Sequence, residues 1–236
     1  MAKESVNAYI LHARPFKETS LLIDLFSRER GRFSVLAKGI KRKNAQAKRA
    51  ILQPFNWLNI EYVGRSDLKT ICQCELVSDA ISLPHRALAC GYYMNELLSR
   101  SIQEEQEFYH LFQHYNESVK ALYTNENLPT ILRNFEICLL EELGVAPQWD
   151  TDTGGIDLSS QSMYYFVFEQ GFERVTEPLD LNSNSVSNKA FSGKAILSLA
   201  NRRYSPEVMK ECQQITQLLL RHIIGNKPLE SRKLWL

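Results

Sequence analysis

The chain has 236 residues, of which 44% are hydrophobic and 23% charged, as is typical of a folded protein with one large or two small domains. No uncharged apolar run approaches the roughly 18 residues that cross a bilayer, and the start of the chain lacks the pattern of a secretory signal. The five cysteines are scattered and odd in number, which argues against a secreted disulfide framework. We therefore expect a cytoplasmic protein with reduced thiols.

A net charge of only +1 conceals a strong segregation of charge along the chain. Residues 1–70 contain 14 Lys and Arg against six Asp and Glu, whereas residues 71–180 contain five against 18. Residues 181–236 are basic again, with nine against three. This asymmetry predicts a first part that binds a polyanion and a middle part that meets other partners.

The first eighty residues are predicted to form β-strands. Five short runs rich in branched and aromatic side chains are separated by polar breaks, at 5–16, 20–27, 31–40, 55–64 and 68–78. A basic insertion separates the third run from the fourth, and we expect it to hold a helical turn or a mobile loop. Five strands with an insertion at this place predict an OB-fold barrel.

Six basic side chains fall within residues 36–50, and no acidic residue occurs between 30 and 60. Such a surface gains affinity for phosphates by releasing counterions. Phe33, Phe55, Trp57 and Tyr62 are candidates to stack on bases, although each also suits the core. The alternative is a solvated loop that serves only solubility. The candidate nucleic-acid-binding residues of the barrel are Arg14, Arg32, Lys38, Lys41, Arg42, Lys43, Lys48 and Arg49.

Helical periodicity begins at Pro84. Apolar residues recur every three to four positions over 84–102, 107–123 and 128–144, and Gly144 is predicted to cap the last of these helices at its C-terminus. A last helix is predicted from about Ser205 to Ile224. These segments predict a helical bundle.

Residues 147–190 differ from their surroundings. They contain a hairpin candidate, in which 163–168 returns through Glu169-Gln170-Gly171, and then a polar loop at 179–189. We therefore expect an α+β fold: a five-stranded OB barrel followed by a helical bundle with a small inserted hairpin and loop. The expected domains are 1–80 (barrel), 81–146 (helical, first part), 147–190 (insertion) and 191–236 (helical, C-terminal part).

Two further sites are candidates for binding. Arg202 and Arg203, near Lys194 and Lys189, either extend the phosphate track or balance the acidic middle of the chain. Arg133, in an apolar helix, either supplies a cation at the lip of a groove for an acidic peptide or pairs with Glu136 one turn away.

Metal and catalytic motifs are weak. Cys72 and Cys74 have no Cys-x-x-Cys partner pair, and His110 and His114 have no evident third ligand. The acidic residues at 150–157 lack the closing glutamate of a calcium loop. We expect no metal, no cofactor and no catalytic nucleophile.

Four segments resemble one known family: AYILHARPFKETSLLIDLFSRERGRFSVLAKGIKR (8–42), LQPFNWLNIEY (52–62), GYYMNELLSR (91–100) and GNKPLESRKLW (225–235). They occur in the order found in the RecO family of bacterial recombination and repair mediators. The resemblance implies a non-enzymatic, nucleoid-associated protein whose OB domain binds single- and double-stranded DNA and anneals complementary strands. It also implies binding to the acidic C-terminal tail of the single-stranded-DNA-binding protein, and joint action with RecR in loading RecA.

The chain departs from some family members in one respect. Those members bind zinc through four cysteines in the inserted region, whereas residues 145–190 contain no cysteine here. We therefore expect the turn from Trp149 to Asp157 to be held by packing and hydrogen bonds. Two alternatives from other classes remain open: a metal-dependent nuclease with an OB substrate clamp, and an RNA-binding OB module.

Overall fold

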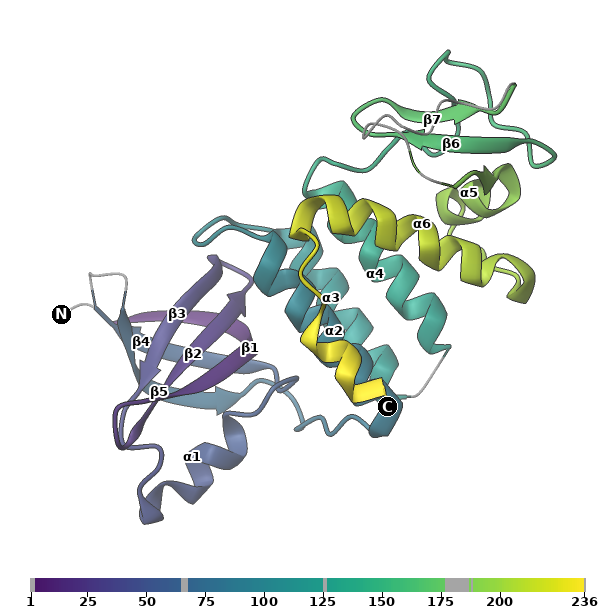
Figure 1. Ribbon diagram of the computed structural model, residues 1–236. Coiled ribbons are helices and arrows are strands. Elements are labelled where there is room, and N and C mark those ends of the chain that lie inside the picture. The colour runs from purple at the N-terminus through teal and green to yellow at the C-terminus, as the bar shows by residue number, and fades with distance from the viewer. Residues whose placement is uncertain (1–2, 65–67, 125–126, 177–186, 188, 236) are drawn as a thin grey trace. The chain divides into compact units, whose positions relative to one another are not determined.

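The computed structural model describes residues 3–64, 68–124, 127–176, 187 and 189–235, without the side chains of Lys43 and Trp235. The expected loop at 179–189 thus lies outside the described residues, apart from Ser187 and Lys189. The chain divides into two compact units (Figure 1). The barrel unit comprises residues 1–128 and 227–236, and the second unit comprises residues 129–226. The four expected domain boundaries stay a prediction.

A closed five-stranded barrel forms the first part of the barrel unit, as the sequence predicted. Its strands follow the order β1-β2-β3-β5-β4 around the barrel, with β3 and β5 parallel and the other neighbours antiparallel. This is the topology of an OB fold. The strands are β1 (Glu4–Phe16), β2 (Ser20–Ser27), β3 (Gly31–Ala37), β4 (Leu58–Val63) and β5 (Lys69–Leu76).

The insertion between β3 and β4 holds a short 3-10 turn, η1 (Lys43–Ala45), and a helix, α1 (Gln46–Ile51). Ile40 before the helix and Leu52 after it are buried members of the barrel core. The insertion is therefore fixed at one end of the barrel by apolar packing on both sides of α1 (Figure 1).

Two helices, α2 (His85–Ser101) and α3 (Tyr109–Tyr123), follow the barrel in the same unit. The pairing of β1 with β2 shifts register between Ile10 and His12. The side chain of Asn95 donates from Nδ2 to the carbonyls of Ile10 (3.3 Å) and Leu11 (3.1 Å) at this irregularity, and its Oδ1 accepts from the Tyr115 hydroxyl (2.6 Å). One buried amide thus joins β1 to both helices.

The segment between α2 and α3 contacts the barrel at the turn joining β2 and β3. A side chain at Gly31, where φ is +67°, would place its Cβ only 1.7 Å from the Gln106 carbonyl oxygen. Glu105 accepts from Lys69 (2.7 Å) and from Arg30 (3.2 Å). These two hydrogen bonds hold the pKa of the Glu105 carboxyl below its usual value. The contact excludes any residue larger than glycine at position 31.

The C-terminal segment forms η2 (Glu230–Trp235) and packs on α2. The Glu96 carboxylate accepts from the backbone N–H groups of Glu230 (3.0 Å) and Ser231 (2.8 Å), and from the Ser231 hydroxyl (2.7 Å). Arg100 donates to the carbonyls of Lys227 and Pro228. Glu96 therefore caps η2 from the neighbouring helix.

The second unit combines helices with a small sheet in the order β7-β6-β8. The predicted hairpin is present, and Gly144 has a φ of +69° just after α4. Helix α5 was not predicted. Apart from α4, which begins at the boundary residue Leu128, the elements lie within the unit: α4 (Leu128–Glu142), β6 (Met163–Val167), β7 (Gly171–Arg174), β8 (Phe191–Ser192), α5 (Gly193–Ala200) and α6 (Pro206–Ile224).

The turn from Trp149 to Asp157 is held by hydrogen bonds and packing. Asp152 accepts through Oδ1 from the N–H groups of Gly154 and Ile156, and Trp149 packs against Phe172. Across the parts of the chain that the structure describes, no helix is both long and apolar enough to cross a membrane.

Candidate nucleic-acid interface

The basic insertion, defined here as residues 38–57, is ordered by its own hydrogen bonds. The Arg49 guanidinium donates to the carbonyls of Ile40 (3.0 Å) and Arg42 (2.9 Å). The Lys41 N–H donates to the Thr19 carbonyl (3.1 Å), which ties the insertion to the turn between β1 and β2. These hydrogen bonds hold the backbone of the insertion in one conformation, and its basic side chains extend from that backbone.

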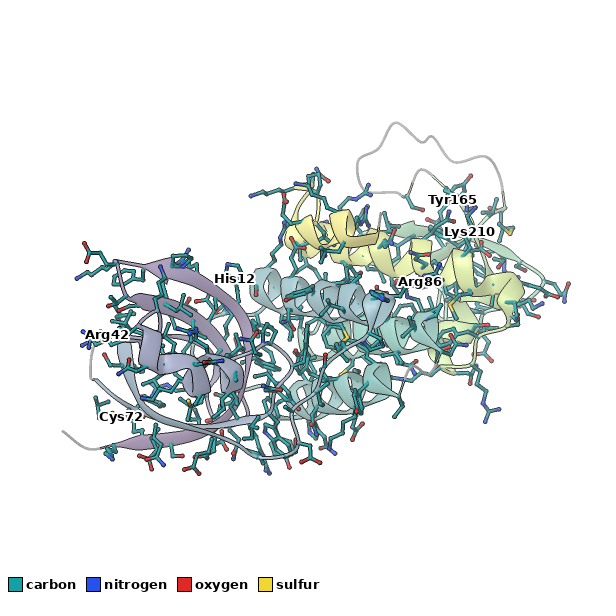
Figure 2. All side chains as sticks on the ribbon, turned by 90° about the horizontal axis from the view of Figure 1, so that it is seen from below. His12, Arg42, Cys72, Arg86, Tyr165 and Lys210 are labelled. Carbon is teal, nitrogen blue, oxygen red and sulfur yellow. The ribbon has the colours of Figure 1, made fainter. Side chains whose placement is uncertain are left out.

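Five predicted phosphate-binding side chains are exposed on the barrel unit (Arg42 is labelled in Figure 2). Within the described ranges none of the five takes part in a salt bridge or a side-chain hydrogen bond, so no carboxylate neutralises them. Arg49 is partly buried by its carbonyl contacts, and the side chain of Lys43 lies outside the described residues. The exposed five are Arg14, Lys38, Lys41, Arg42 and Lys48.

Arg32 has a different environment from the other candidates. Its guanidinium donates to the Ile102 carbonyl (3.1 Å) and pairs with Glu104 (3.3 Å), with 20% of the side chain exposed. A group that is already neutralised and partly buried releases few counterions when a phosphate approaches. We therefore leave Arg32 out of the interface.

The aromatic candidates are mostly core residues. Phe33 and Phe55 are each 2% exposed and Tyr62 is 1% exposed, so none presents a face to a base. Trp57 is partly exposed, and the Lys120 ammonium lies 5.6 Å from the centre of its ring. Of the two roles that the sequence allowed for Phe33, Phe55 and Tyr62, the structure therefore shows the core role and not base stacking.

The turn between β1 and β2 contributes a cation that the sequence analysis missed. Lys17 is exposed there, with φ at +51°, two residues from the carbonyl that binds Lys41. The position of Lys17 in the loop between the first two predicted strands could have indicated this role, because that loop of an OB barrel commonly contacts oligonucleotides.

Arg202 and Arg203 lie in the second unit. Arg202 pairs with Glu141 (2.6 Å), whereas Arg203 is exposed and has no recorded ion pair within the described residues. Nearby, Lys194 pairs with Glu207 and Lys189 donates to Gln214. Two of the four cations of this cluster, Arg202 and Lys194, are thus already compensated by carboxylates.

Arg133 forms the expected intrahelical pair with Glu136, but the pair is buried and not on the surface. The two side chains are 4% and 0% exposed, with Nη2 and Oε1 2.5 Å apart. The Arg133 Nε–H has no hydrogen-bond partner among the described residues. A buried donor without a partner is costly.

The weak metal motifs remain dispersed. Cys72 is exposed on β5, while Cys74 packs against the barrel core and burial raises the pKa of its thiol. Among the residues that the structure describes, no three His, Cys, Asp or Glu side chains are grouped so as to hold a metal ion.

Comparisons with known proteins agree along the whole chain. Residues 1–80 match the family model described as "Recombination protein O N terminal", and residues 85–233 match "Recombination protein O C terminal". The "DNA repair protein RecO" of Alteromonas mediterranea is 34% identical over 100% of this chain and 98% of its own length. Proteins of the same name from Haemophilus influenzae (strain PittGG) and Pasteurella multocida are 35% and 36% identical, over 97% and 92% of their lengths.

Proposed function

This chain belongs to the RecO family of DNA repair proteins, and we propose from that membership that it binds single- and double-stranded DNA through the basic insertion and anneals complementary strands. The observation that carries the proposal is the set of five exposed cations at the insertion and on β1, none of which forms a salt bridge within the described residues. Each cation that meets a phosphate releases a condensed counterion into solution, and the entropy of this release favours binding without requiring a particular base sequence.

Annealing follows from the same electrostatics. Two strands repel each other through their phosphates, and a cationic surface that holds both lowers this repulsion while leaving the bases free to pair. In this mechanism no covalent bond is made or broken, and no nucleotide is consumed. We propose that the chain acts in this way as a non-enzymatic mediator.

The proposed protein partners come from the family resemblance. They are the C-terminal tail of the single-stranded-DNA-binding protein, RecR, and indirectly RecA. The tail is acidic and ends in an apolar residue, and the unsatisfied Nε–H of Arg133 supports a carboxylate contact in the second unit. Because the second unit contains 12 acidic residues against eight basic ones, we propose that an acidic peptide binds only near Arg133 and is repelled by the rest of the unit.

Charge reversal at the insertion tests DNA binding. We expect Lys41→Glu/Arg42→Glu to lower affinity for single-stranded DNA about tenfold or more near 0.1 M salt. The slope of log affinity against log salt should become shallower by about 0.7 for each lost phosphate contact. The matched control is Lys210→Glu/Arg221→Glu, which changes the net charge equally on exposed side chains of α6 and should leave affinity close to wild type.

Three measurements separate the DNA-binding mediator from the nuclease and from the RNA-binding module. Wild-type affinity in Lys41→Glu/Arg42→Glu would refute the interface. Shortening of labelled strands in magnesium or manganese would favour a nuclease, whereas unchanged strand length with faster annealing supports the mediator. Tighter binding to RNA than to DNA of matched sequence would favour the RNA-binding module.

Two substitutions test the proposed tail contact. We expect Arg133→Lys, which keeps the charge beside Glu136 but removes the guanidinium, to weaken binding of an acidic tail peptide about tenfold. DNA affinity should stay unchanged, and thermal unfolding of the full chain must show that the variant is folded. Arg133→Ala should lose the peptide as well, but with lower stability. Equal peptide affinity in a folded Arg133→Lys would remove Arg133 from the site.

A further inference from the structure

The outer face of β1 carries a row of side chains beside the basic insertion. In the pairing of β1 with β2, Arg14 lies opposite Leu22 and Phe16 lies opposite Ser20. Ile23 and Leu25 of β2 belong to the barrel core, so Leu22 and Ser20 point to the other face of the sheet. Directly opposed residues share a face, which places Arg14 and Phe16 together on the outside of the barrel.

The Phe16 ring is reached from solvent. Phe16 is partly exposed, and the ammonium of Lys17, itself an exposed side chain, lies 5.6 Å from the centre of the ring. A cation placed in this way uses the negative face of the aromatic ring. The ring face near Lys17 is therefore covered by a flexible surface side chain and not by the core.

The position of Phe16 relative to the phosphate-binding cations is fixed by the backbone. The turn that follows Phe16 is bonded to the insertion through the Lys41 N–H and the Thr19 carbonyl (3.1 Å). Arg14 is two residues away on the same face of the strand, about 7 Å along it. An aromatic ring flanked by cations on both sides is the arrangement that binds a single strand by stacking and charge together.

We propose that Phe16 is a stacking platform for an unpaired nucleobase, with Lys17 and Arg14 contacting the adjoining phosphates. This inference rests on the proposed DNA binding and names its substrate class, because a base within a duplex has no free face to offer. When a base stacks on Phe16, the Lys17 ammonium moves from the ring to a phosphate. The platform makes the barrel prefer single strands to duplexes.

Affinity measurements on the full chain with three ligands test the platform: a single strand, an abasic strand of equal length, and a duplex. We expect Phe16→Ala to lose about tenfold in affinity for the single strand, the size of one base stacked on an aromatic ring. Affinities for the abasic strand and the duplex, and the salt slope for all three, should not change. Phe16→Tyr should restore single-strand affinity, and Tyr123→Ala, which removes an exposed aromatic on α3, should behave as wild type.

The results that would overturn the Phe16 platform differ from those that would overturn DNA binding. Equal losses on all three ligands, or no loss on the single strand, would overturn the platform while Lys41→Glu/Arg42→Glu still reports on DNA binding itself. Tryptophan fluorescence of the variant Phe16→Trp, which keeps a large aromatic ring, is a second test of the platform. We expect its added fluorescence to be quenched by the single strand and not by the abasic strand, and quenching by both would also overturn the platform.

Discussion

Burial changes the contribution of the ion pair between Arg133 and Glu136 to the second unit. A surface pair at this spacing contributes little, because water screens both charges and the side chains lose rotational freedom. Inside the unit both side chains are buried, and the attraction between the two charges offsets part of the cost of burying them. The pair is therefore a weak source of net stability that is costly to break from one side.

We predict that Arg133→Ala lowers the free energy of unfolding by about 3–5 kcal/mol, because it leaves the Glu136 carboxylate buried without its guanidinium. The double variant Arg133→Met/Glu136→Leu, which removes both charges and keeps apolar volume, should lose much less. Urea unfolding of the full chain measures both. A double variant as unstable as the single one would show that packing, and not the loss of the Arg133 charge beside Glu136, sets the cost.

The sequence offered this pair as one of two alternatives for Arg133 and did not indicate its burial. The spacing of three residues along a helix is local, so it can be counted in the sequence. Burial depends on residues far along the chain, such as Tyr204, which donates to the neighbouring Asn134. The same limit applies to Arg32, whose partner Glu104 is 72 positions away and gave no local signal.

Most helices and strands could be predicted from local sequence patterns, whereas elements that depend on long-range contacts could not. All five strands and the main helices were predicted, because alternation and helical periodicity are properties of short windows. Helix α5 and the C-terminal η2 were missed. Both are short, and η2 is capped by Glu96 from another helix and not by a residue of its own segment.

We predict that Glu96→Ala releases η2 from α2 and costs about 1.5–3 kcal/mol, the range for hydrogen bonds to a charged group. Burial raises the pKa of Glu96, but hydrogen bonds from the Ser231 and Glu230 backbones and the Arg100 charge outweigh it, and the pKa is lowered overall. A lowered carboxyl pKa stabilises the fold above the unfolded value of about 4.3, and this contribution is lost as pH falls through the folded value.

The difference in unfolding free energy between wild type and Glu96→Ala should therefore be constant from pH 7 to about pH 5 and shrink below about pH 4.3. Denaturant unfolding at each pH measures it. Glu230→Gln removes an exposed carboxylate that pairs with Lys233, so it serves as the control and should change stability less. A difference that grows at acid pH would contradict the cap.

We also predict that Asn95→Ala destabilises the barrel unit by about 1–3 kcal/mol, because the carbonyls of Ile10 and Leu11 and the hydroxyl of Tyr115 lose a buried partner. The control is Ser99→Ala, on the same helix, which removes only a hydroxyl that donates back to the Asn95 carbonyl. Thermal unfolding compares them. Equal stability of both variants would mean that the register shift in β1 needs no support from α2.

At the scale of the whole molecule, charge is divided between the two units. The barrel unit contains 20 basic and 15 acidic residues, while the second unit contains eight and 12. Many acidic residues of the barrel unit are bound to its own cations, as Glu105 is to Lys69 and Arg30. Four cations of the insertion are exposed instead: Lys38, Lys41, Arg42 and Lys48. We therefore expect a polyanion to be attracted to the barrel unit and repelled by most of the second unit.

Hydrogen exchange of the full chain with a single-stranded oligonucleotide should resolve this division. We predict slower exchange in residues 14–20 and 38–51 and no change in residues 129–226, and the protection should fade between 0.05 and 0.3 M salt as phosphate contacts weaken. An acidic tail peptide should give the opposite pattern, with protection in the second unit. DNA-dependent protection of α6 or of the segment that holds Arg203 would extend the phosphate path into the second unit, and a salt-independent pattern would show that charge does not drive the binding.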